Sequence, residues 1–165
     1  MKVERRVHSG VLLLKEGIEQ MFMGQFRHTL DDKGRLTIPA RYRDLLMGGA
    51  YVTQGFDGNL IVYPVPVFQA ISQRVSKLTV TDPETRNLRR MLYSSGEQVD
   101  VDRAGRILIA SFLRDLAKLK SEVVVVGSGD YFELWSPEAW EVQFAGLQDL
   151  EANAKRFATF DLSSG

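Results

Sequence analysis

Apolar and polar residues alternate along residues 21–30, a pattern typical of a β-strand with one face in a core. The turn-forming residues Asp31–Gly34 follow, and a second strand pattern runs from Arg35 to Ile38. This order predicts a β-hairpin in which Gly34 takes a positive φ, because glycine adopts that conformation at no steric cost.

A short helix and a second hairpin follow. Pro39 suits the first turn of a helix, and Gly48-Gly49 suits its end. Two strand patterns, residues 51–53 and 60–63, then flank Asp57-Gly58, a pair typical of tight hairpin turns. Residues 21–67 are therefore predicted to form one small unit of two hairpins and a short helix.

The same pattern returns 71 residues later without a gap. Asp31-x-x-Gly34-Arg35-x-x-Ile38 aligns with Asp102-x-x-Gly105-Arg106-x-x-Ile109, and ten positions between 31 and 66 are identical at this offset. A fixed offset that holds across turns and apolar runs indicates a duplicated structural unit. We therefore predict a second, homologous unit over residues 96–139.

Helical patterns fill the remaining segments. Residues 68–95 are predicted to form connecting helices, one of them capped by Asp82-Pro83. Residues 140–165 are predicted to form a C-terminal amphipathic helix and tail. Apolar residues of this helix keep helical spacing for about five turns: Trp140, Phe144, Leu147, Leu150, Ala154 and Phe157. The predicted fold is α+β with a mainly β core.

Residues 1–20 lack a capped, periodic element. They are predicted to be a disordered N-terminal extension that the fold does not need, and Met21 is a candidate for the true start of the chain.

Composition narrows the class of protein. Apolar residues make up 44% of the 165 residues and cysteine is absent, which excludes a disulfide scaffold, a thiol nucleophile and a cysteine-ligated metal site. No apolar run approaches the roughly 20 residues that a membrane-spanning helix needs. We expect a cytoplasmic protein that does not contact a membrane.

The formal net charge is zero, but the charges are unevenly distributed. Residues 1–120 contain 19 basic and 13 acidic side chains, whereas residues 121–165 contain 2 and 8. Such a distribution allows a neutral chain to present a basic surface to a polyanion. An ordinary solvated surface also contains scattered Lys and Arg, so charge alone leaves both interpretations open.

Signals for an enzyme or a metal site are weak. His28 precedes Asp31 and Asp32, but a strand followed by a turn would scatter these groups, and the aligned position in the second unit is Val99. Gly127-x-Gly129 lacks the helix and the Lys-Ser/Thr pair of a phosphate-binding loop. We expect no catalytic residue, cofactor, metal or small-molecule substrate.

Both units retain Asp-x-x-Gly-Arg at a hairpin tip. One hypothesis is structural: Arg35 and Arg106 pair with Asp31 and Asp102 and fix the turns, as short ion pairs often do. The other is functional, because a planar guanidinium group on a rigid hairpin can reach phosphates or a guanine edge. The two hypotheses are compatible.

The stretch from Met21-Phe22-Met23-Gly24 through Leu30-Asp31-Asp32-Lys33-Gly34-Arg35-Leu36-Thr37-Ile38-Pro39-Ala40-Arg41-Tyr42-Arg43 resembles the opening of the MraZ family of bacterial transcriptional regulators. The resemblance covers about 140 residues and includes the duplicated Asp102-x-x-Gly105-Arg106 motif. It implies two AbrB-like swapped-hairpin β-barrel halves and assembly into a ring-shaped homo-oligomer. The implied function is binding of double-stranded DNA at direct repeats upstream of the division and cell-wall gene cluster, with repression of the chain's own operon and a location at the nucleoid.

The resemblance also assigns residues to DNA contact. The family signature falls on Asp31, Lys33, Gly34 and Arg35, with Asp102, Gly105 and Arg106 as the second-unit counterparts; Arg41 and Arg43 lie nearby in the sequence. Ala104 aligns with Lys33, and Ala110 with Pro39, so the role of the second unit is less secure. The alternative interpretation is an antitoxin-type protein-interaction module, since AbrB-like halves also occur in antitoxins.

Overall fold

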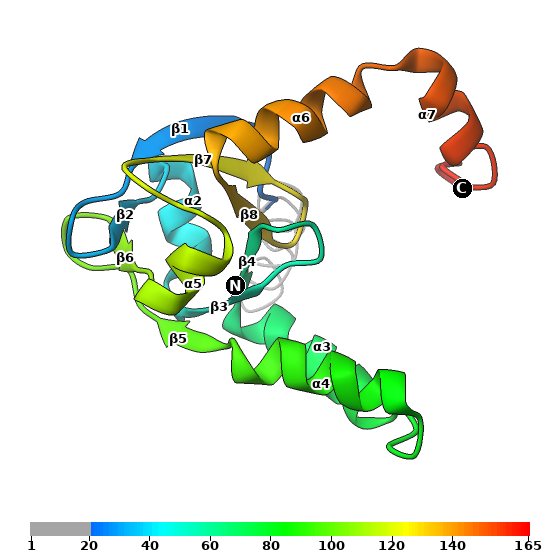
Figure 1. Cartoon of the computed structure of the whole chain (residues 1–165), viewed down its shortest axis with the longest axis horizontal. Helices are drawn as coiled ribbons and strands as arrows, with labels where there is room; N and C mark the ends of the chain where they lie inside the picture. Colours follow the sequence, from blue (N-terminus) through cyan, green and yellow to red (C-terminus); the bar gives the residue numbers. More distant parts are fainter. Residues whose placement is uncertain (1–20) are drawn as a thin grey trace, which may run out of the picture.

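The computed structural model describes residues 21–165, so the expectations for residues 1–20 lie outside the described residues. The strands are β1 (Gln25–Thr29), β2 (Arg35–Thr37), β3 (Ala50–Gln54), β4 (Leu60–Pro64), β5 (Glu97–Val99), β6 (Arg106–Leu108), β7 (Glu122–Gly127) and β8 (Phe132–Trp135). The helices are α2 (Ala40–Arg43), the 3₁₀-helix η1 (Asp44–Leu46), α3 (Val65–Ser76), α4 (Pro83–Ser94), α5 (Ser111–Leu116), α6 (Pro137–Leu147) and α7 (Leu150–Arg156). Figure 1 shows a central sheet with helices around it.

The strands form a six-stranded antiparallel sheet in the order β1-β7-β8-β4-β3-β5 and a two-stranded ribbon, β2-β6. The predicted hairpins β3-β4 and β7-β8 are confirmed, with Val52 opposite Val62 and Val125 opposite Leu134. They lie side by side through β4 and β8, so the two repeats share one sheet.

The local pattern predicted that the first two strands of each repeat pair with each other, and this prediction is wrong. β1 pairs with β7, β5 pairs with β3, and β2 pairs with β6, so these strands are exchanged between the repeats. Within the first repeat, a single bridge between Leu30 and Leu36 remains. A unit of about 45 residues buries too little apolar surface alone, and the exchange gives both repeats one common core.

The six-stranded sheet is open, so the expected closed barrel is not formed. β1 and β5 are the two edges, and β2 and β6 pair with each other instead of joining those edges. A barrel needs every edge to be paired, whereas here the ribbon is a separate layer.

The ribbon is anchored in the core by equivalent residues of both repeats. Leu36 pairs with Ile107, and both side chains are buried. Ile38 and Ile109 at the ribbon ends are also buried, and the hydroxyl of the buried Tyr42 donates to the Met23 carbonyl oxygen at 2.7 Å. The buried side chains therefore hold the β2-β6 ribbon firmly against the core.

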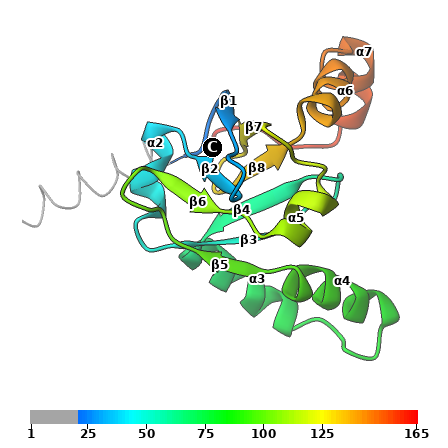
Figure 2. The same cartoon turned by 60° about the vertical axis from the view of Figure 1, so that its left-hand side comes forward.

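The helices extend on opposite sides of the sheet, with α3 and α4 below it and α6 and α7 above it in both views (Figures 1 and 2). The Phe68 ring stacks on Tyr51 at 4.4 Å and contacts Tyr93 of α4 edge-on at 6.2 Å. On the other side, Trp140 of α6 packs on Trp135 at 5.5 Å. The Asp82 cap is confirmed, because its carboxylate accepts from the Glu84 amide at 2.9 Å.

The prediction of a single amphipathic helix in residues 140–165 is wrong, because the structure has two helices there. α6 ends at Leu147, and α7 begins at Leu150 after a new N-cap at Asp149, whose carboxylate accepts from the Ala152 amide at 3.0 Å. An aspartate that bonds the backbone in this way competes with continuation of the helix. In residues 21–165, no helix is long and apolar enough to cross a bilayer.

Candidate nucleic-acid interface

The loop at residues 31–35 is closed around the carboxylate of Asp31. Asp31 Oδ1 accepts from the amides of Lys33 at 3.0 Å and Arg35 at 2.8 Å, and Oδ2 accepts from Arg35 Nε at 2.7 Å. Gly34 has φ +83°, as predicted, and its amide donates to the Asp31 carbonyl at 3.0 Å. A short polar side chain that satisfies several backbone donors makes such a loop rigid.

The loop at residues 102–106 repeats this geometry. Asp102 Oδ1 accepts from the amides of Ala104 at 3.0 Å and Arg106 at 2.9 Å, and Oδ2 accepts from Arg106 Nε at 3.0 Å. Gly105 has φ +77°. The structural hypothesis for the motif is thus confirmed in both repeats, because each arginine pairs with its own aspartate.

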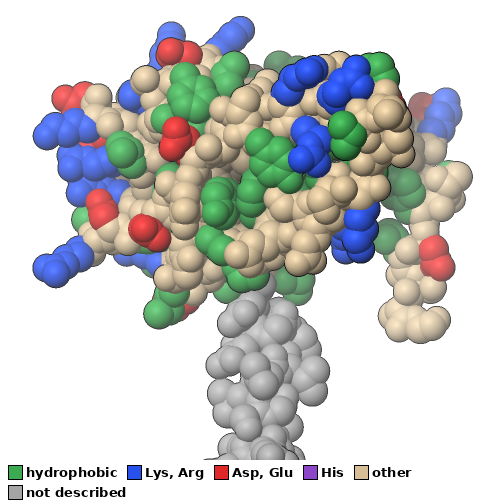
Figure 3. All heavy atoms as spheres, turned by 90° about the horizontal axis from the view of Figure 1, so that it is seen from below, with side chains coloured by type: hydrophobic (Ala, Val, Ile, Leu, Met, Phe, Trp, Pro, Cys, Tyr) green, Lys and Arg blue, Asp and Glu red, His purple; other side chains and the backbone are tan. Residues whose placement is uncertain are grey.

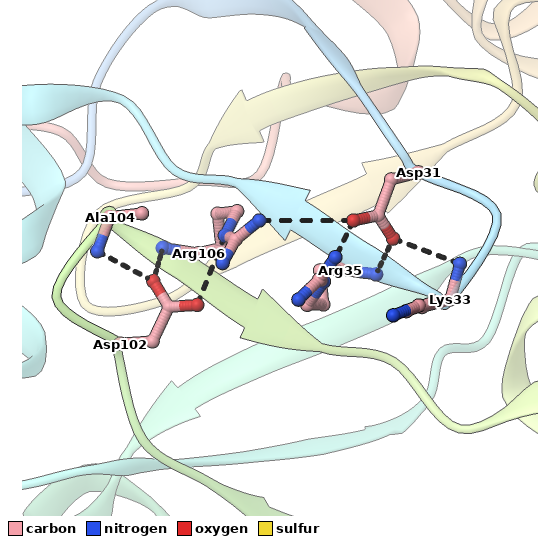
Figure 4. Close-up of polar contacts among 6 residues, drawn as sticks. All are labelled: Asp31, Lys33, Arg35, Asp102, Ala104 and Arg106. Carbon is pink, nitrogen blue, oxygen red and sulfur yellow. Dashed lines mark hydrogen bonds and ion pairs between the residues drawn. The ribbon is translucent and has the colours of Figure 1, made fainter.

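Strand exchange brings the two loops together at the ribbon (Figure 4). Arg106 Nη1 lies 3.9 Å from Asp31 Oδ2, so Arg106 lies between two carboxylates. The four charged side chains of the two motifs, 71 residues apart in sequence, form one cluster.

Hydrogen bonds lower the pKa of both aspartates. The Arg35 amide, followed by the Arg35 guanidinium group, lowers the pKa of Asp31 below its ordinary value, and Arg106 has the same effect on the pKa of Asp102. The carboxylates therefore stay charged, and stay paired with the arginines, to a lower pH than an isolated aspartate would.

The arginines are anchored but not covered. The Arg35 side chain is 35% exposed and that of Arg106 30% exposed, while Gly34 and Gly105 are buried. Each arginine pairs with the aspartate of its own loop through Nε, which leaves the terminal nitrogens of Arg35 for an external acceptor. Because that guanidinium group is already oriented, binding costs little side-chain entropy.

The other two predicted arginines lie differently. Arg41 is exposed, with its guanidinium carbon 5.5 Å from the centre of the Phe26 ring. Arg43 is half-buried, and its Nε donates to the Ile38 carbonyl at 3.1 Å. Lys33 is exposed at the tip of its loop.

Figure 3 shows Lys and Arg side chains gathered at the left end of the molecule, the end at which Figure 1 places β2 and β6. Acidic side chains are interspersed there, so the surface is mixed rather than uniformly basic. Recognition at this end would depend on individual arginines more than on total charge.

The structure gives no support to a metal site at His28. Among residues 21–165, no group of three or more His, Asp or Glu side chains could hold an ion. Burial, with a smaller contribution from the charge on Arg43, lowers the pKa of His28. His28 is therefore a neutral strand residue at physiological pH.

Sequence reasoning missed Arg114, which lies against Gly34 of the first loop. The signal was present, because Arg114 aligns with Arg43 at the 71-residue offset. Its position depends on the strand exchange, which the local pattern does not encode.

Comparison with known proteins agrees with the duplication. The profile of the family described as "MraZ protein, putative antitoxin-like" matches the chain twice, over residues 21–91 and 92–162. The chain belongs to the MraZ family.

Three MraZ relatives show the extent of the similarity, and each is named "Transcriptional regulator MraZ". The protein of Roseiflexus castenholzii is 45% identical over 138 residues, covering 84% of this chain and 94% of the relative. That of Thermomicrobium roseum is 46% identical over 123 residues, covering 74% and 87%, and that of Moorella thermoacetica is 41% identical over 143 residues, covering 86% and 100%.

Each copy of the MraZ profile contains one of the two loops, and the division between the copies falls within α4. The loops are therefore equivalent positions of the duplicated MraZ unit.

Proposed function

We propose that this chain is a DNA-binding transcriptional regulator and not an enzyme. The observation that carries the proposal is the pair of rigid Asp-x-x-Gly-Arg loops, each of which holds a partly exposed arginine at one end of a shared two-stranded ribbon. A two-stranded ribbon fits the major groove of B-DNA, where arginine can pair with a guanine edge or contact phosphates.

The residues proposed for the DNA interface have four kinds of role. Lys33, Arg35, Arg41 and Arg106 provide charged donors, and Asp31 and Asp102 orient the arginines. Gly34 and Gly105 provide the positive φ of the loops and leave room for Arg114 and Arg43. Arg43 lies at the base of the loops, against Gly105, and is the last of the proposed interface residues. Arg35 is the principal contact, because Arg106 is shared between two carboxylates and its loop has Ala104 in place of Lys33.

The DNA-binding body would consist of two AbrB-like, swapped-hairpin units, residues 21–67 and 96–139, joined by connecting helices over 68–95. Pairing of β1 with β7 and of β5 with β3 supports this division, since each unit contributes an edge strand to the other. Residues 140–165 would form a separate C-terminal arm.

The proposed target is a set of direct repeats upstream of the division and cell-wall gene cluster, where binding represses the chain's own operon. This target follows from family membership. A cytoplasmic, nucleoid-associated location follows from the same function.

We further propose that copies of the chain assemble into a ring. The arm, which consists of α6, α7 and the residues after them, exposes large apolar side chains, including Val142 at 76%, Leu150 at 82% and Phe160 at 61%. It is acidic, whereas α4 on the opposite side of the molecule has the basic residues Arg86, Arg89 and Arg90. Unlike faces on opposite sides favour head-to-tail contacts, which close into rings.

The alternative candidate is an antitoxin-type interaction module. The family description includes the words "putative antitoxin-like", and the exposed apolar arm would suit a protein partner as well as a second copy. This candidate predicts binding of a protein partner without sequence-specific DNA binding.

The test is a DNA titration with the full chain. Fluorescence anisotropy would compare a fragment upstream of the chain's own gene with a scrambled fragment at several salt concentrations. The regulator predicts specific binding that weakens as salt increases, and much tighter binding to three or four repeats than to one. Equal affinity for both fragments would contradict it and favour the interaction module.

A further inference from the structure

Two arginines lie beneath the loops, and each contacts the loop of the opposite repeat. A Cβ atom added to Gly105 would overlap the guanidinium group of Arg43, which belongs to the first repeat. A Cβ atom added to Gly34 would lie 3.0 Å from Cζ and Nε of Arg114, which belongs to the second repeat. The contact is therefore duplicated and reciprocal.

The same hydrogen bond fixes both arginines. Arg43 Nε donates to the Ile38 carbonyl at 3.1 Å, and Arg114 Nε donates to the Ile109 carbonyl at 3.1 Å. An isoleucine carbonyl at the base of the ribbon thus orients each guanidinium group.

The two isoleucines also bond directly to the opposite loops. The Ile38 amide donates to the Gly105 carbonyl at 2.9 Å, and the Ile109 amide donates to the Gly34 carbonyl at 2.7 Å. Each isoleucine therefore binds its arginine through its carbonyl and the opposite glycine through its amide, and the arginine packs on that same glycine. Such a closed set of contacts restrains the glycine in its left-handed conformation.

These arginines differ from the loop arginines in their surroundings. Arg35 and Arg106 pair with aspartates, whereas neither Arg43 nor Arg114 forms an ion pair within residues 21–165. Both are half-buried, and their contacts depend on a flat guanidinium group against the backbone. Lysine keeps the charge but lacks that planar group and Nε.

We propose that Arg43 and Arg114 are positioning residues, each of which holds the Asp-x-x-Gly-Arg loop of the opposite repeat in its DNA-binding conformation. The proposal rests on the proposed function and deepens it. It assigns to Arg114 the positioning of the first loop. It also changes the role of Arg43 from direct contact with DNA to positioning of the second loop. It also makes the two loops interdependent, because neither repeat builds its loop alone.

Two lysine variants of the full chain, R43K and R114K, test this role by amide hydrogen exchange in the absence of DNA. The Gly105 amide donates to the Asp102 carbonyl and the Gly34 amide to the Asp31 carbonyl, so each amide reports on its own loop. R43K should accelerate exchange at Gly105 by about tenfold and leave Gly34 unchanged. R114K should do the reverse.

The same variants are then titrated with upstream DNA. Either substitution should weaken binding by about tenfold without changing the salt dependence, because the charge is kept and only the loop geometry is lost. The matched control is R27K, since Arg27 is an exposed β1 arginine paired with Glu122. It should change neither exchange in the loops nor affinity.

Three results would overturn the positioning role. One is normal affinity in both lysine variants while R43A and R114A reduce the salt slope by about one, which identifies direct phosphate contacts. Another is acceleration confined to the loop of the substituted repeat. The third is equal acceleration throughout the core, which identifies a general loss of stability. A wild-type chain that binds no DNA would overturn the proposed function, whereas the crossed exchange pattern decides the positioning of the loops by itself.

Discussion

The loops at residues 31–35 and 102–106 have the same internal hydrogen bonds but different surroundings. In both, the first aspartate accepts from two backbone amides and from the arginine Nε. The first loop adds Lys33 at its tip, where the second has Ala104, and Asp31 also lies near Arg106. The repeated residues set the shape of the loops, and we expect the residues that differ to set how strongly each loop binds a phosphate.

The largest expected effect is on the free energy of unfolding, and it differs between Gly34 and Gly105. In G34A the new Cβ would lie 2.8 Å from the Ile109 carbonyl oxygen, which is backbone and cannot move freely, and its φ is +83°. We expect a loss of about 3 kcal/mol in the free energy of unfolding. G105A should cost less, about 1–2 kcal/mol, because the Arg43 side chain can move away.

Urea denaturation would measure both losses. G58A is the control, since Gly58 has φ +74° but an added Cβ would meet nothing within 4 Å, so only the backbone cost of about 1 kcal/mol remains. Equal losses in G34A and G58A would show that the contact across the ribbon contributes nothing.

Removal of the loop arginines should weaken DNA binding to different extents in the two loops. R35A is expected to weaken DNA binding by about 1–3 kcal/mol while the fold stays intact, and R106A should weaken it less. R27A, which removes a distant exposed arginine, is the control. Titration alongside circular dichroism would check this, and an unfolded R35A would favour a purely structural role for the pair with Asp31.

Substitution of the tip residues Lys33 and Ala104 should change DNA affinity less than removal of the loop arginines. K33A removes a charge from the first loop and is expected to weaken binding by less than about 1 kcal/mol and to reduce the salt slope by about one. A104K should increase the slope by the same amount. A slope that neither variant changes would place both tips away from the phosphates.

The smallest effect concerns pH. Hydrogen bonds from Arg35 and Arg106 lower the pKa of Asp31 and Asp102 below the ordinary 3.8. A depressed aspartate pKa stabilises the fold above pH 3.8, and this stabilisation is lost as pH falls through the folded-state pKa. Carboxyl-carbon NMR titration should give midpoints below 3.8 for both groups, and a midpoint at or above that value would contradict the anchoring.

Much of the local structure was predictable, because it depends on neighbours in sequence. The glycine conformations in the loops, the β3-β4 and β7-β8 hairpins and the Asp82 cap all follow from short patterns. The duplication followed from a fixed offset. The pairing of each loop arginine with its own aspartate followed from their spacing.

The partners of β1, β2, β5 and β6 did not follow from the local pattern, because alternation shows that a segment is extended but not which strand it pairs with. The family resemblance implied swapped hairpins, but it gave neither these strand pairs, nor the open sheet, nor the contact of Arg114 with Gly34. The break at Asp149 was missed because the apolar spacing continues through it, while a single capping side chain divides the helix.

Hydrogen exchange of the wild-type chain with and without upstream DNA tests the central claim most directly, because it shows which surface the DNA covers. We predict protection at residues 31–35 and 102–106, stronger in the first loop, and none in α6 and α7. Protection confined to α4, with its basic residues Arg86, Arg89 and Arg90, and unchanged exchange in both loops would contradict the account.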